Sequence, residues 1–469
     1  MSSPVAALEP SRLRGRTAWV ASWASLVPLL AYRAGNLTES DTFWQIRAGQ
    51  LILSTGAIPR ADTWSWTANG EPWTMNSWGF NVLIGLAHLV GGLPLAALAC
   101  AGLAAAAMAV VLLLSARLGS SPVIAAVLAT VTVALLLGWL SARPQLVDYL
   151  ALPALVLLLR GVIASLRPVP WSLASVGLAG LWMNLHAAAL LGVAIAGVVG
   201  VVLLLRAASR GRALWVLATA AAMALATLAT PYGLEGYGQA GSVHGASAGV
   251  ISEWAPLNPT HPVELVALVL AVCGLVCAIR LREPVVAVAL VITAVGGVFA
   301  IRLLPIAALV AVAPLAAVLS APALLARLRG LRAVTIPGTV VWLALAGWLA
   351  AGALTHPGRP DAGLYSRDAI AAIPAGCRTV NTYAVGGYLG LVRPAVLVSI
   401  DSRNDLFGAA RVLAATDLVN GDGDLAAGLS GAGCVLVPTA APLAERLATD
   451  PDWTPAARDA IQVLYVRKT

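Results

Sequence analysis

Long apolar stretches follow one another along most of this chain, separated by short segments that carry the charged residues. A helix needs roughly 20 apolar residues to cross the hydrocarbon core of a bilayer. Stretches of about this length recur up to residue 355, so the pattern predicts an all-α polytopic membrane domain over residues 1–355. We expect eleven spans, at 17–35, 93–116, 121–141, 145–160, 170–187, 189–205, 213–230, 263–279, 285–302, 304–325 and 336–354.

The segment 77–91 is apolar but differs from these spans. It is short, contains Asn81 and His88, and ends in Gly91-Gly92. A stretch of about 15 residues is too short to cross comfortably, so we expect it to lie in the interface or to dip in and return. The alternative is a twelfth span, which would invert the orientation of everything that follows.

The distribution of arginine predicts the orientation. With the N-terminus inside and the spans alternating, the inner segments hold 14 Arg and two acids, and the outer segments before residue 356 hold five Arg and eight acids. Cytoplasmic loops are enriched in Lys and Arg, so we expect a cytoplasmic N-terminus and a large extracytoplasmic first loop, 36–92, with interfacial helices. The inner residues are Arg12, Arg14, Arg16, Arg117, Arg160, Arg167, Arg206, Arg210, Arg212, Arg280, Arg282, Arg327, Arg329 and Arg332.

Residues 356–469 have a different pattern, with shorter apolar runs and eleven acids. Alternation of predicted strands and helices favours a small α/β domain, which the topology places outside the cytoplasm. We expect strands at 377–383, 395–400, 432–438 and 461–466, and helices at 364–373, 407–419 and 440–449.

Composition agrees with a membrane protein: 59% of residues are hydrophobic and 11% are charged, against about 25% charged residues in soluble domains. The net charge of +8 is dispersed at the ends of apolar runs, so it indicates membrane topology and no nucleic-acid partner. We expect Cys100, Cys273 and Cys277 to be buried small hydrophobes. A disulfide between Cys377 and Cys434 is possible but is not determined by the sequence.

The predicted outer side collects several motifs: Asp41–Gln45, Gly56–Asp62, Arg143-Pro-Gln145, Trp182–His186, Thr230–Gly233, Ile251–Trp254, Gly386–Leu389 and Ile400–Asp405. With these motifs the chain resembles the GT-C class of integral membrane glycosyltransferases, in particular a group of bacterial membrane proteins built on that plan. That resemblance implies transfer of a sugar from a polyprenyl-phosphate donor to an acceptor on the outer face. It also implies inversion at the anomeric carbon and an acidic residue in the first outer loop.

Such a transfer requires a carboxylate that accepts the proton of the acceptor hydroxyl. Asp41 is the candidate base, with Glu39 beside it on the same face if the segment is extended. The alternative is that Asp41 caps a helix that starts at Thr42. Asp41 is also a candidate weak ligand for Mg²⁺ or Mn²⁺, but Gln45 stands where members of the group often have His, which weakens a metal interpretation. No other metal site is expected.

The departing phosphate requires cations near the membrane surface. Arg143 and Arg302 are the candidates; alternatively they reach the outer headgroups or pair with Asp148 or Glu253. The other candidate substrate-binding residues are Asn184, His186, Glu253, and Trp44 and Trp78, which would stack on sugars, although most Trp residues of the first loop are expected to anchor in the interface. Asp401, Arg403 and Asp405 follow a predicted strand, where we expect a solvated turn in preference to a ligand site.

We therefore expect a multi-pass enzyme of the bacterial cytoplasmic membrane, whose partners are the bilayer, a polyprenyl-phosphate-linked sugar and a glycan, lipid or protein acceptor. One alternative is a non-catalytic scaffold or partner subunit with the same fold. Another is a transporter of lipid-linked substrates, which the lack of a repeat between the halves and the scarcity of charge inside the spans disfavour.

Overall fold

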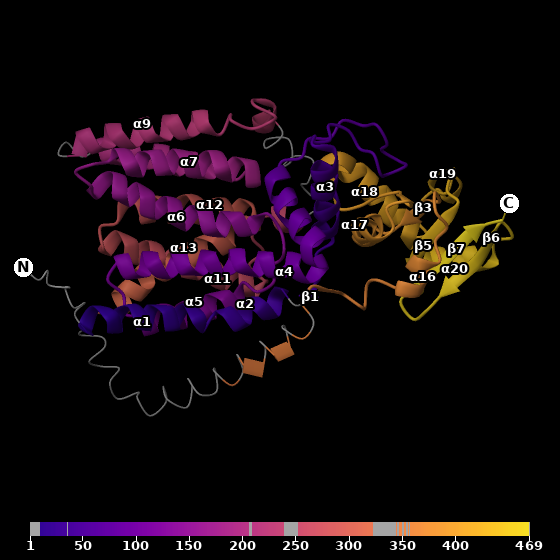
Figure 1. The fold of residues 1–469 in the computed structure, drawn as a ribbon, viewed down its shortest axis with the longest axis horizontal. Helices are drawn as coiled ribbons and strands as arrows, with labels where there is room; N and C mark the ends of the chain where they lie inside the picture. Colours follow the sequence, from indigo (N-terminus) through magenta and orange to yellow (C-terminus); the bar gives the residue numbers. More distant parts are fainter. Residues whose placement is uncertain are drawn as a thin grey trace, which may run out of the picture.

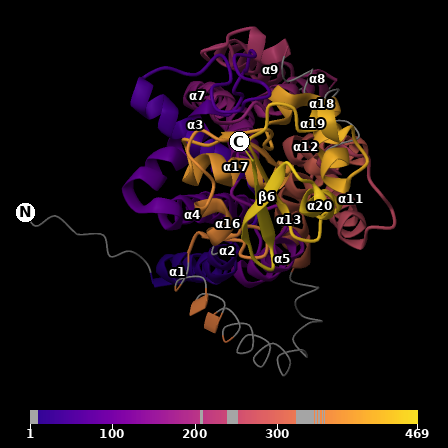
Figure 2. The same cartoon turned by 90° about the vertical axis from the view of Figure 1, so that its right-hand side faces the viewer.

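The computed structural model describes residues 10–34, 36–205, 209–238, 252–321 and 357–468, together with six isolated residues between 344 and 355. Long helices lie side by side in a bundle, and a smaller domain with a β-sheet lies at one end of it (Figure 1). Figure 2 looks onto this smaller domain, along the helices of the bundle. The described residues thus comprise a mostly helical part and a smaller part that contains the sheet.

The helices of the bundle follow the apolar stretches closely. Short connections join many consecutive helices, which places these neighbours antiparallel. The first expected span, 17–35, is divided between two helices, and the last, 336–354, lies almost wholly outside the described residues. The bounds are α1 (Pro10–Ala24), α2 (Val27–Ala34), α3 (Ser40–Thr55), α4 (Trp78–Arg117), α5 (Pro122–Leu135), α6 (Gln145–Ala164), α7 (Val169–Leu185), α8 (Ala189–Leu204), α9 (Arg210–Ala226), α11 (Pro262–Arg280), α12 (Pro284–Phe299) and α13 (Leu304–Leu319).

Within the described residues, four helical stretches are long and apolar enough to cross a bilayer: Trp78–Arg117, Gln145–Ala164, Pro262–Arg280 and Ile301–Leu319. The last of these joins the short 3-10 turn η3 (Ile301–Leu303) to α13. Helices α5, α8 and α12 are shorter and equally apolar, and they lie in the same bundle. The chain is a multi-pass membrane protein, while eleven remains a predicted number of spans.

Helix α4 consists of two parts, separated by non-helical backbone at Gly91 and Gly92. The first part packs beside α3 across the end of the bundle, and the second part runs along the bundle (Figure 1). The packing is close: a Cβ on Gly49 of α3 would lie 1.8 Å from the backbone oxygen of Asn81. The segment that was expected not to cross therefore lies across the bundle and returns the chain to the same end.

The C-terminal domain contains a five-stranded sheet in the order β4-β3-β5-β7-β6. Strand β3 (Arg378–Asn381) is parallel to β4 (Leu397–Val398) and β5 (Cys434–Pro438), and β7 (Gln462–Arg467) is antiparallel to β5 and β6 (Trp453–Arg458). Four strands lie where the sequence predicted strands. Strand β6 was not expected, because it is an edge strand with mostly exposed side chains and contains a proline.

Three helices of this domain also match the expected positions: α16 (Arg367–Ala371), α18 (Asn404–Asn420) and α20 (Pro442–Thr449). Two more were not predicted as helices, α17 (Tyr383–Val392) and α19 (Leu425–Gly428). Helix α17 was not predicted because it contains glycines at 386, 387 and 390, and glycine is a poor helix former. These glycines permit close packing: a Cβ on Gly387 would lie 2.7 Å from the backbone oxygen of Ser40 in α3.

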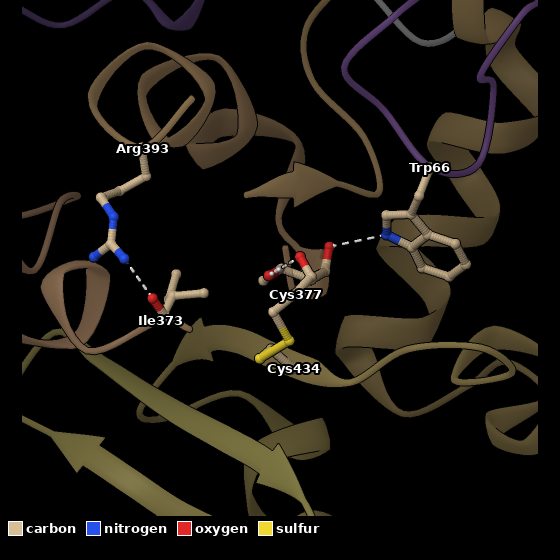
Figure 3. Close-up of a disulfide and its surroundings, with 6 residues drawn as sticks. Trp66, Ile373, Cys377, Arg393 and Cys434 are labelled. Atoms are coloured by element: carbon tan, nitrogen blue, oxygen red, sulfur yellow. Dashed lines mark hydrogen bonds between the residues drawn. A yellow bond between two sulfur atoms is a disulfide. The ribbon is translucent and has the colours of Figure 1, made fainter. Parts of the chain in front are cut away.

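The cysteines divide into a bonded pair and free thiols. Cys377 and Cys434 form a disulfide with their Cα atoms 6.1 Å apart (Figure 3). Cys377 precedes β3 and Cys434 begins β5, so the pairing of these strands brings the two together. Cys100 is buried as expected, but Cys273 is exposed. The expectation for Cys273 was wrong because α11 lies at the edge of the bundle, with most of its surface uncovered by protein.

The first loop docks onto the C-terminal domain. Strand β1 (Asn36–Leu37) pairs with β2 (Arg359–Pro360), and the backbone N–H of Trp66 donates to the oxygen of Val398 at 3.0 Å. The second contact covers the edge strand β4, whose polar backbone groups would otherwise lack partners. The indole of Trp66 donates to the oxygen of Thr379 at 3.2 Å (Figure 3). The loop therefore connects the membrane domain to the sheet.

Candidate active site

Four charged side chains from three distant segments meet at the end of the bundle that faces the C-terminal domain. Arg143 lies among them, and its Nη2 donates to Oδ2 of Asp41 at 2.8 Å. Its Nη1 forms a hydrogen-bonded ion pair with Glu253 and lies 3.8 Å from Oε2 of Glu39. The structure therefore brings together the predicted base, its neighbouring acid, one predicted phosphate clamp and Glu253.

The start of α3 positions the carboxylates of this cluster. The helix begins at Ser40, with Glu39 at its N-cap, so Asp41 lies in the first helical turn and not at the cap that the alternative reading proposed. Because Asp41 lies within the helix, the condition under which Glu39 and Asp41 would share a face, an extended segment, is not met. Nε1 of Trp44, one turn later, donates to Oδ1 of Asp41 at 3.3 Å. A carboxylate in the first turn is favoured by the helix dipole.

Mutual electrostatics fix the charge state of this cluster. Burial alone would lower the pKa of the Arg143 guanidinium, but the nearby Asp41, Glu253 and Glu39 carboxylates outweigh burial and raise it. Burial also raises the pKa of Glu39, against the opposing effect of Arg143. Arg143 is therefore a permanent cation, and Glu39 holds a proton to a higher pH than an exposed glutamate.

A second polar group lies nearby, between α6 and α7. Nδ1 of His186 is 2.8 Å from both carboxylate oxygens of Asp148, and Nε1 of Trp182 donates to Oδ1 of Asp148 at 2.7 Å. Both side chains of the His–Asp pair are about nine-tenths buried. A carboxylate that holds one imidazole nitrogen fixes the tautomer and orientation of the ring, which leaves Nε2 available.

His186 and Asp148 line a cavity of about 530 Å³ at the same end of the bundle. Arg302 lines it as well, with its guanidinium carbon 4.2 Å from the centre of the Trp254 ring. Among the residues that the structure describes, Arg302 makes no ion pair, in contrast to the alternative in which it pairs with Asp148 or Glu253. Gln145 also lines this cavity, and its Oε1 is buried and has no hydrogen-bond partner among the described residues.

The cavity and the Arg143 cluster adjoin each other. Two residues that line the cavity lie close in sequence to the ion-pair cluster. Trp254 directly follows Glu253, and Gln145 lies two residues after Arg143. Asp41 and Arg143 themselves are not among the described residues that line it. The predicted charged site residues and His186 therefore fall into two neighbouring groups, one around the Arg143 guanidinium and one around the cavity.

The aromatic candidates have different surroundings. Trp44 is 7% exposed and packs edge-on against Trp73, so the expected stacking of a sugar on Trp44 finds no open ring face. Trp78 is half-buried, and its indole donates to Oδ1 of Asn184 at 3.0 Å. Asn184 donates in turn to the backbone oxygens of Gly180 and Ala229, so it joins α4 to the ends of α7 and α9.

The strand-end cluster of the C-terminal domain is not the solvated turn that we expected. Arg403, Asp401 and Asp62 have no exposed side-chain surface, and the guanidinium pairs with both carboxylates. It also lies 4.1 Å from the centre of the Trp64 ring and 4.8 Å from that of Trp73. The turn is buried because the first loop folds over it, which a sequence pattern could not reveal.

The same burial corrects the expectation for the first-loop tryptophans. Trp64 donates to Asp401 at 3.1 Å and Trp73 donates to Asp405 at 3.2 Å, so these rings dock the C-terminal domain and do not anchor in the bilayer interface. Burial raises the pKa of Asp405 to about 6, although the bond from Trp73 opposes this. Indole N–H groups pair with buried acids here, as buried polar groups require.

A divalent cation at Asp41 does not fit this arrangement. Asp41 and Glu253 both point at Arg143, whose guanidinium stands where a shared cation would have to be. Within the described residues, no three His, Cys, Asp or Glu side chains are placed to share a metal ion. The donor groups suit a hard cation, but as arranged they form an ion-pair site.

From the sequence, Asp148 was expected only as an ion-pair partner of an arginine, and Trp254 was not expected to line a cavity. Asp148 could have been recognised, because a carboxylate inside a predicted span is costly unless it has a partner. The pairing of Trp254 with Arg302 had no sequence signal, since 48 positions separate them and neither belongs to a repeated pattern.

No family model matches the sequence, and neither does any curated protein. Solved structures do match. The oligosaccharyltransferase AglB from Archaeoglobus fulgidus, in complex with an inhibitory peptide and a dolichol-phosphate, aligns with a TM-score of 0.59 and 12% identity, covering 92% of this chain and 70% of that one. An Archaeoglobus fulgidus oligosaccharyltransferase tethered to an acceptor peptide with the NVT sequon aligns with a TM-score of 0.61 and 12% identity, covering 91% of this chain and 69% of that one.

ArnT from Cupriavidus metallidurans in the apo state aligns over 97% of this chain and 98% of that one, at 14% identity, with a TM-score of 0.48 that is too low to add weight. The match to AglB identifies the fold: this chain has the architecture of the GT-C class of integral membrane glycosyltransferases, as its motifs implied.

Proposed function

We propose that this chain is a membrane glycosyltransferase that moves a sugar from a polyprenyl-phosphate donor to an acceptor on the extracytoplasmic face. The observation that carries the proposal is the cavity that Arg302 and the His186–Asp148 pair line, beside the Asp41–Arg143 cluster. The GT-C fold supports it, because a neighbour with this fold, AglB, was solved with a dolichol-phosphate.

Arg302 is the proposed clamp for the donor phosphate. It is the cation of the cavity wall, it makes no ion pair among the described residues, and the Trp254 ring holds it in place. Arginine suits a phosphate because its planar fork donates two parallel hydrogen bonds. His186, oriented by Asp148, supplies a further donor or acceptor at Nε2. The apolar remainder of the wall, including Leu190, Leu191 and Ile306, suits the start of a polyprenyl chain.

Asp41 is the proposed base, and the Arg143 guanidinium, which also lies 3.8 Å from Glu39, holds it in position. Its Oδ1 accepts a single long bond from Trp44 and retains lone pairs for the proton of an acceptor hydroxyl. The acceptor oxygen then forms a bond to the anomeric carbon, the bond from that carbon to the phosphate oxygen breaks, and the phosphate leaves with the electron pair. One displacement inverts the anomeric configuration.

The proposed sidedness is a cytoplasmic N-terminus in a bacterial cytoplasmic membrane, with the C-terminal domain outside. The excess of Arg in the predicted inner loops supports this orientation. The Cys377–Cys434 disulfide supports it independently, because disulfides persist in oxidising compartments and are rare in the cytosol. The acceptor would approach Asp41 from beneath the C-terminal domain, and Trp78, Asn184 and Glu253 would border its path.

The test is a transfer assay with purified protein in lipid nanodiscs and a panel of polyprenyl-phosphate sugars. We expect Asp41→Asn to lower the transfer rate by at least about 100-fold, the loss typical of a missing general base. Asp422→Asn, at an exposed position of the C-terminal domain, is the matched control and should transfer like the native protein. Full turnover by Asp41→Asn would show that Asp41 is not the base.

One observation favours a second candidate, a non-catalytic scaffold or partner subunit: both oxygens of Asp41 already have protein partners. If the native chain transfers no sugar from any donor but still binds polyprenyl phosphate, the scaffold is the better description. A transporter would instead move the lipid-linked substrate across proteoliposome membranes, and flux in that assay would replace both proposals.

A further inference from the structure

A larger hollow lies at the opposite end of the bundle from the proposed active site. It has a volume of about 960 Å³ and is lined by α4, α6 and α7 and by the start of α12. These three long helices lie side by side, with α6 in the middle (Figure 1). The walls are apolar side chains such as Val110 and Leu113 of α4, Leu157 of α6 and Leu178 of α7. We call this hollow the α4–α7 groove.

The mouth of the α4–α7 groove is positively charged. Three arginines and one glutamate line it: Arg117, Arg160, Arg282 and Glu283. Arg160 donates through two nitrogens to both oxygens of Glu283, at 2.8 Å each, so this pair is neutral. The side chains of Arg117 and Arg282 are exposed and have no ion pair or hydrogen bond within the described residues. The positive charges of Arg117 and Arg282 are therefore uncompensated at the mouth of the apolar α4–α7 groove.

The backbone at Arg282 gives an independent indication that its side chain matters. Its φ of 56° is the single positive value at a non-glycine residue in the described part of the chain. This left-handed conformation is unfavourable for any residue with a Cβ, and glycine would adopt it without strain. The turn between α11 and α12 therefore holds an arginine in a strained conformation and places its charge at the groove.

An aromatic side chain completes the mouth. Trp171, in the first turn of α7, packs directly over Gly161 of α6, where a Cβ would lie 2.3 Å from the ring. Tryptophan favours the boundary between headgroups and hydrocarbon. Trp171 thus indicates the depth at which polar headgroups meet the apolar chains, and the two free arginines lie at the same end of the groove.

We propose that the α4–α7 groove binds one anionic phospholipid of the bilayer, with its phosphate between Arg117 and Arg282 and its chains along α4 and α7. Charge complementarity selects this occupant: basic pockets between membrane helices bind anionic headgroups, whereas a zwitterionic lipid gains less from two cations. The site is separate from the sugar-transfer cavity, so it stands whether or not the proposed function does.

The test compares phosphatidylglycerol with phosphatidylcholine of identical chains, and lipid retention by the purified full-length protein is read out by native mass spectrometry. We expect the native protein to retain phosphatidylglycerol at least about tenfold more strongly, as two favourably placed arginines imply. The double variant Arg117→Gln/Arg282→Gln should lose this preference. The matched control Arg167→Gln/Arg212→Gln removes the same charge from the same end outside the groove and should keep it.

A second variant tests the apolar walls of the α4–α7 groove. Ala174→Trp fills the groove from an exposed position on α7, so it leaves the packed core intact and should displace phosphatidylglycerol while the thermal stability of the apoprotein stays unchanged. Equal losses in both arginine double variants would mean general charge attraction and would overturn the site. Native retention by Ala174→Trp would overturn the placement of the chains.

Discussion

Arg143, Arg403 and Arg411 each join segments that lie far apart in the sequence, but they do so at very different depths. The side chain of Arg403 is wholly buried, that of Arg143 is 18% exposed and that of Arg411 is 43% exposed. Water screens an ion pair in proportion to its exposure, so pairs of the same chemistry have different consequences for the fold. The intermediate exposure of Arg143 suits a group that must hold a carboxylate and still admit a substrate.

The comparison between Arg403 and Arg411 makes a prediction at the residue scale. Both connect the first loop to the region around α18, through Asp62 and Glu71 respectively. Arg403→Met should lower the free energy of unfolding by about 3–5 kcal/mol, because it leaves two carboxylates buried without a counter-charge. Arg411→Met should cost less than about 1 kcal/mol, as exposed pairs do.

Denaturant or thermal unfolding of the purified proteins in the same detergent measures both changes. Similar losses in the two variants would show that the buried cluster does not dominate the docking of the first loop.

At the scale of elements, the antiparallel contact between α3 and the first part of α4 sets the position of Asp41. Gly49 and Gly85 let the two backbones approach so closely that a Cβ on either would meet the other helix within 3 Å. Helix α17 of the C-terminal domain packs on the opposite side of α3, where Gly387 and Gly390 lie close to it. The helix that carries the proposed base is thus held between two glycine-lined surfaces.

Gly49→Ala should therefore separate α3 from α4 and lower the free energy of unfolding by about 1–3 kcal/mol or more, as overpacking does. Gly102→Ala, in the second part of α4 with no atom within 4 Å of its new Cβ, is the control. It should be neutral or slightly stabilising, because alanine favours the helix. Unfolding curves of the two variants check this, and equal stability would contradict the close contact.

At the scale of the whole molecule, the residues expected on the outer side gather at one end of the bundle, under the C-terminal domain. Asp41, Arg143, His186, Glu253 and Arg302 all lie there, while the paired Arg160 and Glu283 lie at the other end. The structure thus gathers at one end of the bundle the residues that the charge pattern assigned to one side.

This separation of the two ends predicts the outcome of labelling in intact cells. Cysteines at the exposed positions Asp452 and Arg167 would be introduced singly, with Cys100, Cys273 and Cys277 replaced by serine and the disulfide kept. A membrane-impermeant maleimide should label the Asp452→Cys protein in intact cells and the Arg167→Cys protein only after permeabilisation. The reverse result would place the cavity and Asp41 on the cytoplasmic side.

Much of the architecture was predictable because it depends on local composition. Apolar runs, the excess of Arg between alternate runs, and the short strands after residue 376 are each signals within a window of about 20 residues. The short segment 77–91, with its terminal Gly91-Gly92, was recognised in the same way, and the structure turns it across the bundle. Residue types also identified Asp41, Arg143, Arg302 and His186 as candidates.

Partners, in contrast, were decided by tertiary structure. Arg143 meets Asp41 across 102 positions and Glu253 across 110, and no periodicity connects residues at such separations. The buried Arg403 resembles a solvated turn in sequence, because its burial depends on Trp64 and Trp73 folding over it from the other end of the chain. The sequence determines which side chains are unfavourable to bury without a partner, and only the tertiary structure determines which of them lie close enough to pair.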